Sequence, residues 1–179
     1  VLSVEGFEKE TDERRGKGVY QKLMNTMDLL RENKIPFGFS VTYTRLNAET
    51  VTDEKFLDML INKGAIFGWY FLYMPVGREP STELMATPEQ RKKLGEFTRW
   101  ARENKPIWPM DFWNDAPYVT GCIAGGRRYV HINHKGEVEP CIFLHFSGGN
   151  VKDKPLIEIL KSPLFTTIRK FQPFNKNLL

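Results

Sequence analysis

The feature that most constrains the fold is a repeated alternation of strand-like and helix-like segments over the first two-thirds of the chain. Short apolar runs alternate with longer segments whose apolar residues recur every three or four positions. The expected strands cover residues 1–4, 37–43, 65–73 and 107–110, and the expected helices cover residues 19–33, 52–63 and 87–104. Single helices between consecutive strands are typical of right-handed βαβ units and a parallel sheet.

Local signals support these segments. Thr87-Pro88-Glu89-Gln90 places a hydroxyl at the N-cap, Pro at the first helical position and Gln at the third. Thr52 is expected to cap the helix before it. The third strand is apolar at nearly every position, which predicts burial on both of its faces.

Four strands and three helices do not close a barrel of six or eight strands. The chain begins on a strand-like segment without Met, and it ends in Asn177-Leu178-Leu179 with no terminating feature. We therefore interpret both ends as truncations and expect the missing strands to precede Val1.

The composition of the chain limits the classes of partner that it is expected to bind. At 179 residues, 41% hydrophobic and 27% charged, the chain is typical of one globular domain or two small ones. The net charge is only +4 and the Lys and Arg residues are scattered, which argues against nucleic-acid binding. The most apolar run, residues 65–76, is shorter than the ~20 residues of a membrane span. We expect a cytoplasmic location, with neither nucleic acid nor membrane as a partner.

The character of the sequence changes near residue 117. Residues 128–133 and 137–140 alternate around His134-Lys135-Gly136, which predicts a β-hairpin. Short helices are expected at residues 155–161 and 163–169. Two regions result, residues 1–117 and residues 118–179.

Two cysteines flank this hairpin. Cys122 and Gly136 are separated by thirteen residues, and Gly136 and Cys141 by four. Two thiolates brought together by a tight turn can ligate a soft metal or an iron–sulfur cluster, although such a site needs further ligands. Buried thiols and a disulfide are the alternatives. Zinc is a further one, because His131, His134 and His145 lie nearby, but their spacing matches no zinc-finger pattern.

This segment resembles a known family. Gly121-Cys122-Ile123-Ala124-Gly125-Gly126-Arg127-Arg128-Tyr129, continued by Gly136-Glu137-Val138-Glu139-Pro140-Cys141, is similar to the opening half of the SPASM motif of radical S-adenosylmethionine (SAM) enzymes. The resemblance implies that Cys122 and Cys141 help to bind an auxiliary 4Fe–4S cluster. The remaining cluster cysteines of the family lie further downstream than this chain extends.

The N-terminal segment resembles the same family. Ser3-Val4-Glu5-Gly6 is similar to the end of the fourth barrel strand, and residues 11–18 to the loop and helix start that follow it. The resemblance implies that Ser3 and Glu5 face SAM and that Arg15 pairs with the SAM carboxylate. Without the resemblance, Arg15 would be interpreted as a solvated charge in a loop. Glu5 would be interpreted as an ordinary carboxylate at the end of a strand.

Other candidates follow the later strands, because active sites of βα barrels lie at strand carboxyl ends. Thr44 and Asn47, then Tyr73 and Met74, are candidate cofactor or substrate contacts, with packing as the alternative for the latter pair. Asp111 and Asp115 are candidate proton acceptors, with loop capping as the alternative.

The resemblance implies the C-terminal half of a partial (βα)6 TIM-like barrel, α/β in class, followed by a truncated SPASM-like hairpin and helix region. The Cys-x3-Cys-x2-Cys motif that binds the family's catalytic cluster is absent from this sequence. We expect the parent enzyme to cleave SAM reductively to a 5′-deoxyadenosyl radical that abstracts hydrogen from a peptide or protein substrate. Flavodoxin or ferredoxin is the expected type of electron donor. The chain itself is expected to be inactive. The rival interpretations are a non-catalytic metal-binding module and a small α/β domain with buried thiols.

Overall fold

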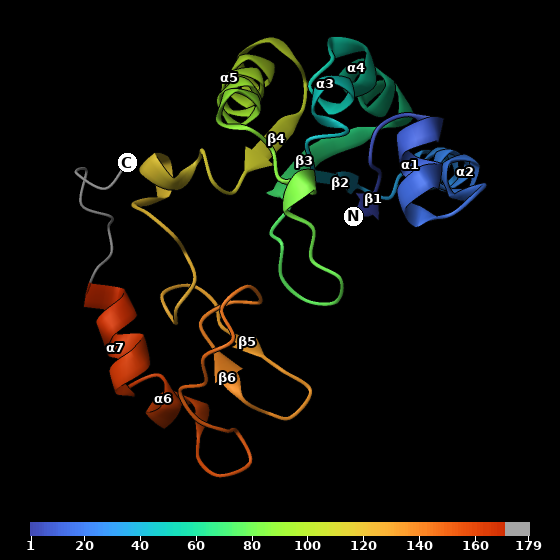
Figure 1. The fold of residues 1–179 in the computed structure, drawn as a ribbon. Helices are drawn as coiled ribbons and strands as arrows, with labels where there is room; N and C mark the ends of the chain where they lie inside the picture. Colours follow the sequence, from blue (N-terminus) through green and yellow to red (C-terminus); the bar gives the residue numbers. More distant parts are fainter. Residues whose placement is uncertain (171–179) are drawn as a thin grey trace. The chain divides into compact units, whose positions relative to one another are not determined.

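The computed structural model describes residues 1–170, and the chain divides into two compact units, with the boundary in the sequence between Asp115 and Ala116. The first unit has a four-stranded parallel sheet in the order β1-β2-β3-β4, with helices along one side of it (Figure 1). Consecutive strand order with parallel pairing confirms the predicted α/β architecture of a partial barrel. None of the helices in residues 1–170 is long and apolar enough to cross a membrane.

The first unit begins with β1 (Leu2–Ser3), α1 (Glu8–Arg15), α2 (Val19–Glu32) and β2 (Phe37–Tyr43). It continues with α3 (Ala48–Val51), α4 (Glu54–Lys63), β3 (Ala65–Leu72), the 3-10 turn η1 (Thr82–Leu84), α5 (Pro88–Asn104) and β4 (Trp108–Asp111).

The core lies between the sheet and its helices. Phe39, Val41 and Tyr43 of β2 alternate toward the helices and are fully buried, as strand periodicity requires. Tyr70 of β3 joins them, and its hydroxyl donates to the carbonyl of Val51 at 3.1 Å. The core therefore fixes which face of each strand turns toward the helices.

Glycines on β2 and β3 allow an aromatic ring from each strand to pack against the backbone of the other strand. A Cβ on Gly68 would lie 2.1 Å from the ring of Phe39, and a Cβ on Gly38 would lie 2.5 Å from the ring of Phe67. Because both glycines lack a side chain, each ring can lie flat on the neighbouring strand.

Several sequence expectations need correction. The segment before α2 is not only a loop, because it contains α1, whose acidic first turn and basic last turn suit the helix dipole. Thr52 does not cap α4: Asp53 does, accepting from the Lys55 amide at 2.7 Å, while Thr52 follows the short α3. β4 is displaced by one residue from the expected range, because Asp111 still pairs with Tyr70. Thr87 does form its capping box with Gln90.

The second unit contains the 3-10 turn η2 (Ala116–Val119), β5 (His131–Ile132), β6 (Val138–Glu139), α6 (Leu156–Ile159) and α7 (Pro163–Lys170). β5 and β6 pair antiparallel, so the predicted hairpin is present but short. Its small core consists of Val138, Ile159 and Phe165, which pack the hairpin against both helices. The tail beyond Lys170 is outside the described residues.

Candidate active site at the carboxyl edge of the sheet

The carboxyl ends of the parallel strands meet at one edge, where most of the candidate residues lie. Glu5 follows β1 and its side chain is only 1% exposed. Arg15 of α1 donates to Glu5 Oε1 from Nε at 2.8 Å and from Nη2 at 2.5 Å. The amide of Thr42 donates to Glu5 Oε2 at 3.0 Å, and Arg14 Nε lies 3.5 Å from Oε1. The structure thus brings Glu5 and Arg15 together as a buried carboxylate with cationic neighbours.

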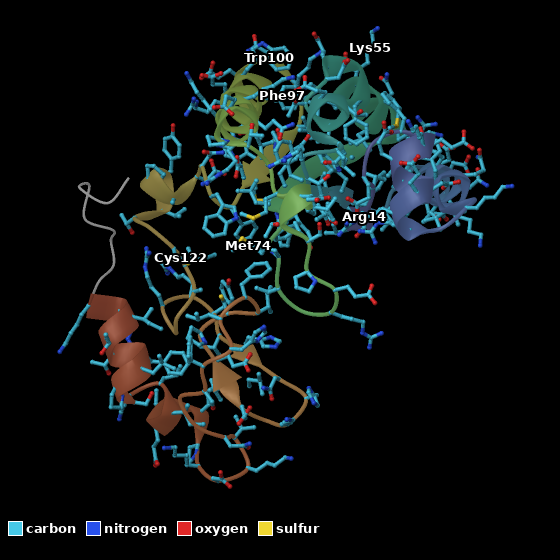
Figure 2. The ribbon with its side chains drawn as sticks, in the orientation of Figure 1. Arg14, Lys55, Met74, Phe97, Trp100 and Cys122 are labelled. Atoms are coloured by element: carbon cyan, nitrogen blue, oxygen red, sulfur yellow. The ribbon has the colours of Figure 1, made fainter. Side chains whose placement is uncertain are left out.

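The connection between α1, which carries Arg15, and α2 is fixed by Asp12. Its carboxylate accepts from the amides of Gly18 at 2.6 Å and Tyr20 at 2.8 Å, which are free donors at the start of α2. These amides, that of Tyr20 first, lower the pKa of Asp12. Asp12 therefore ties the end of α1, where Arg14 lies (Figure 2), to the start of α2.

Asn47 and Thr44 form an internal network. Asn47 Nδ2 donates to the carbonyls of Glu5 at 2.9 Å and Thr42 at 3.0 Å, and Oδ1 accepts from the amide and the hydroxyl of Thr44. Both residues are about 95% buried. With its amide group occupied in this way, Asn47 clamps the ends of β1 and β2 and acts as a positioning residue for Glu5.

Tyr73 and Met74 follow β3 and are half-buried. The hydroxyl of Tyr73 accepts from the Ser81 amide at 3.1 Å, so this ring anchors the long segment between β3 and α5. The hydrogen bond supports the packing alternative for Tyr73, while Met74 lies at the end of the strand where a ligand could contact it (Figure 2).

Asp111, the last residue of β4, and Asp115 lie together at the end of that strand. Burial raises the pKa of Asp111, and hydrogen bonds from Asn114 and the Trp113 amide oppose that rise. Asp115 accepts from Arg102 at 2.8 and 2.5 Å and from the Asp111 amide at 2.9 Å. These contacts close the turn after the strand, so the geometry favours loop capping over proton transfer for both carboxylates.

A row of side chains, whose polarity changes from strand to strand, crosses the sheet face opposite the helices. Strand register aligns Ser3, Ser40, Trp69 and Met110 across the four strands. The hydroxyls of Ser3 and Ser40 are 2.9 Å apart, and Trp69 Nε1 donates to Met110 Sδ at 3.1 Å. The row is thus polar on β1 and β2, and aromatic or thioether on β3 and β4.

This face corrects one expectation and adds residues that the sequence did not single out. β3 is not buried on both faces, because Ile66 is 53% exposed and Phe67, Trp69 and Phe71 are only half-buried. An unbroken apolar run hides which residues face the helices. Ser40 and Trp69 therefore emerge only from the strand register.

The two cysteines of the second unit are free thiols. Cys122 is exposed and accepts from the Ala124 amide at 3.4 Å, whereas Cys141 is half-buried. Burial raises the pKa of the Tyr129 phenol, and the nearby Cys141 and Cys122 raise it further.

The histidine alternative gains little. His145 Nδ1 and His131 Nε2 lie 3.4 and 3.9 Å from Glu139 Oε2, and Asn133 donates to Oε1 at 2.8 Å. Burial raises the pKa of Glu139, but these hydrogen bonds and charges outweigh it and the net shift is downward. Among residues 1–170, no three His, Cys, Asp or Glu side chains form a group able to hold a metal ion. The two cysteines remain candidate cluster ligands, and the zinc alternative has no completed group of ligands among these residues.

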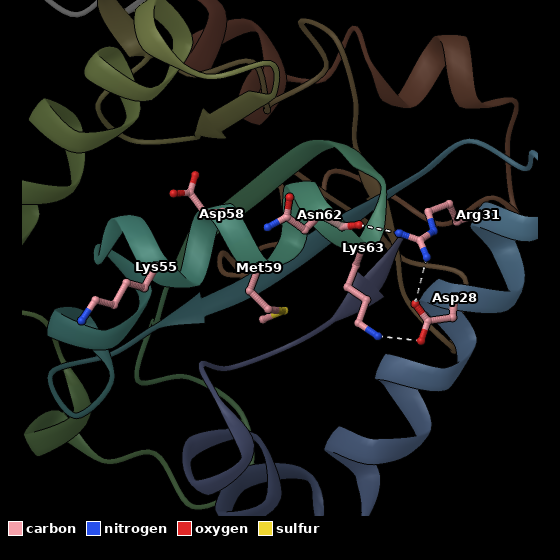
Figure 3. Close-up of a pocket in the computed structure, with 7 residues that line it drawn as sticks. All are labelled: Asp28, Arg31, Lys55, Asp58, Met59, Asn62 and Lys63. Carbon is pink, nitrogen blue, oxygen red and sulfur yellow. Dashed lines mark hydrogen bonds and ion pairs between the residues drawn. The ribbon is translucent and has the colours of Figure 1, made fainter.

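A shallow pocket of about 500 Å³ lies elsewhere, between α2 and α4 (Figure 3). Lys63 Nζ lies 2.6 Å from Asp28 Oδ2, and Arg31 donates to the Asn62 carbonyl at 2.7 Å. The predicted site residues do not line it. Asp28 of α2 pairs with Lys63 of α4 and lies 3.9 Å from Arg31, so these charges join the two helices.

The chain is similar to several known proteins. Residues 122–178 match the model of SPASM, an iron–sulfur cluster-binding domain. An AdoMet-dependent heme synthase of Oleidesulfovibrio alaskensis is 28% identical over 197 residues, covering 94% of this chain and 50% of the relative. One of Methanosarcina barkeri is 24% identical over 183 residues, covering 88% and 52%. The chain spans about half the length of the curated relatives it matches.

Solved structures share the fold. Streptococcus suis SuiB matches with a TM-score of 0.71 and 16% identity, over 95% of this chain and 45% of SuiB. The structure of anSMEcpe with bound AdoMet and a peptide matches with a TM-score of 0.67 and 17% identity, over 97% and 53%. Residues 122–178 therefore match the iron–sulfur cluster-binding SPASM domain, and the chain as a whole is similar to AdoMet-dependent heme synthases and shares the fold of SuiB and anSMEcpe.

Proposed function

We propose that the protein containing this chain is a radical SAM enzyme whose SAM site lies at the carboxyl edge of this sheet. The observation that carries the proposal is the union, in one chain, of a SPASM region with a sheet whose fold occurs in structures with bound AdoMet. When bound, the catalytic cluster and SAM would supply a 5′-deoxyadenosyl radical that removes hydrogen from a substrate. An electron donor such as ferredoxin or flavodoxin would support that chemistry.

The residues of this chain would bind and orient SAM. Arg15 keeps 34% of its side chain exposed while it holds Glu5 through Nε and Nη2, which leaves Nη1 for a ligand carboxylate. A planar guanidinium suits bidentate recognition of such a group. Glu5 would keep Arg15 in place, and Asn47 would keep Glu5 in place, so the cationic site is organised before the ligand arrives.

Two substrate classes come from the relatives. The curated relatives, 24–28% identical, are named heme synthases, whereas SuiB and anSMEcpe, 16–17% identical, were solved with peptides. A peptide or protein substrate was expected from the sequence resemblance. The higher identity of the heme synthases favours a tetrapyrrole.

The test is 5′-deoxyadenosine release from SAM by the intact protein, purified anaerobically and supplied with reductant. We expect release by the wild type and a loss of SAM affinity of roughly tenfold or more for Arg15→Ala, because a charge-assisted bidentate contact is removed. Arg99→Ala, on the exposed side of α5, is the matched control and should behave as wild type. Absence of release together with metal binding by the chain would favour the non-catalytic metal-binding module.

A further inference from the structure

An aromatic cluster lies on the sheet face opposite the helices. It consists of Trp69 and Phe71 of β3 and Phe112, which follows β4. The Phe71 and Phe112 rings stack with centroids 5.0 Å apart and planes 21° apart. Trp69 meets each of them edge-on, with both centroid distances at 5.7 Å. We call these three residues the open-face cluster.

The open-face cluster is not part of the helix-facing core. Tyr70 and Leu72 alternate with Trp69 and Phe71 along β3, and it is these two that are buried in the core. Phe112 is 38% exposed, and the other two rings are half-buried. Grouped exposed aromatic side chains are costly in water and commonly mark a binding surface.

The polar requirements of the cluster are already met. The indole Nε1 of Trp69, its one hydrogen-bond donor, is directed to Met110 Sδ. What remains for a ligand is ring surface, with no hydrogen bonding from the three side chains. A peptide backbone bound there would leave its amides and carbonyls unsatisfied, whereas a conjugated ring system would not. Edge-to-face and offset-stacked contacts can also continue onto one more aromatic ring.

The cluster adjoins the proposed SAM site. Ser3 pairs with Ser40, and Ser40 pairs with Trp69, so two strand spacings of ~4.8 Å place Trp69 about 10 Å from Ser3. Thr42, whose amide holds Glu5, pairs with Phe71 in the same way. A ligand on the cluster would therefore lie beside a SAM molecule held at Glu5 and Arg15.

We propose that Trp69, Phe71 and Phe112 form the substrate-binding surface of this enzyme and select a flat conjugated macrocycle of the tetrapyrrole class by stacking. This inference rests on the proposed function and assigns specific residues to the substrate side of the same site. The choice of a tetrapyrrole follows from the aromatic surface, which offers few hydrogen bonds. It also follows from the strand pairing that joins Trp69 to Ser40 and Ser3, beside the proposed SAM site.

The test is equilibrium binding of metal-free protoporphyrin to the intact protein, followed by its absorbance and fluorescence, with no SAM present. Without iron, this probe cannot be held by axial ligation to His, Cys or Met, so binding reports contact with the rings. Phe112→Leu and Trp69→Leu should each weaken binding roughly tenfold, through loss of ring contact and buried area. Trp69→Phe, which keeps a ring, should restore most of the affinity.

Trp100→Leu is the matched control, because Trp100 lies on α5 and packs against Phe97, away from the sheet (Figure 2). It should bind the probe as the wild type does. If Trp69→Leu fails to fold, Phe112→Leu alone decides, because Phe112 is exposed. Unchanged binding in the foldable cluster variants would overturn the inference, as would cluster-dependent binding of a cysteine-containing peptide in place of the porphyrin. Failure of deoxyadenosine release alongside cluster-dependent porphyrin binding would instead contradict the proposed function.

Discussion

Glu5 shows how single residues organise this site. Its carboxylate is nearly inaccessible and receives the Thr42 amide and the Arg15 guanidinium at once. A buried carboxylate is stable only when its charge and lone pairs are met in this way. Glu5 is therefore a structural support of the cationic site as well as a candidate neighbour of SAM.

Replacement of Glu5 should lower stability. Glu5→Ala leaves the Thr42 amide without its acceptor and Arg15 without its counter-charge, at a cost of about 2 kcal/mol in the free energy of unfolding. Urea unfolding measures this change. Glu8→Ala, exposed at the start of α1, should change it by less than about 0.5 kcal/mol. Equal effects of the two substitutions would show that the Glu5 contacts contribute nothing specific.

Asp12 predicts a dependence of stability on pH. Backbone amides of Tyr20 and Gly18 lower its pKa from the ordinary value of 3.8. A folded-state pKa below the unfolded one means that the stabilisation is present above pH 3.8 and is lost as the pH falls through the lower folded value. Asp12→Asn should therefore lower the melting temperature most at neutral pH, and the gap to wild type should narrow in acid.

Thermal melts of both proteins between neutral and acidic pH would measure this gap. Glu13→Gln, an exposed neighbour on α1, is the control and should show little gap at either pH. A gap for Asp12→Asn that stays constant across the range would refute the capping role of the Asp12 charge.

Among the helices and strands, the pattern of buried residues determines which elements could be predicted from the sequence. α2, α4, α5, β2 and β3 were predictable because each carries buried apolar residues at its own period. α1 lacks such a pattern, since Thr11 is its only buried residue and Asp12 and the Arg15–Glu5 pair hold it instead. Contacts between residues distant in sequence leave no local periodicity.

The same reasoning applies to the site. Family motifs indicated Ser3, Glu5 and Arg15, but their mutual contacts depend on the register of β1 against β2. The open-face cluster was hidden because β3 is apolar along its whole length. Only pairing with β2 and β4 separates its two faces.

The close packing of the Phe39 ring of β2 against Gly68 of β3 is testable. Gly68→Ala would place a methyl group 2.1 Å from Phe39 in the core, and overpacking of this kind costs about 1–3 kcal/mol. Adding Phe39→Leu to that variant makes room and should recover part of the loss in urea unfolding. If the two substitutions were simply additive in their damage, the close approach would not explain the need for glycine.

Over the whole molecule, the two parts of the chain carry different kinds of candidate site. A parallel sheet with a cationic site at its carboxyl edge is followed by a SPASM region with two free cysteines. Both parts were recognisable from sequence motifs. A complete ligand set for a cluster was not, and among the described residues the only cysteines are the candidate ligands Cys122 and Cys141.

The most direct test of this account is the iron and acid-labile sulfide content of the intact protein, reconstituted anaerobically, before and after Cys122→Ser and Cys141→Ser. Serine keeps the size of the side chain but replaces the soft thiolate that iron–sulfur clusters require. We predict that the double variant loses the iron and sulfide of one 4Fe–4S cluster and keeps the remainder. Unchanged iron and sulfide in the folded double variant would contradict the assignment of these cysteines to a SPASM cluster.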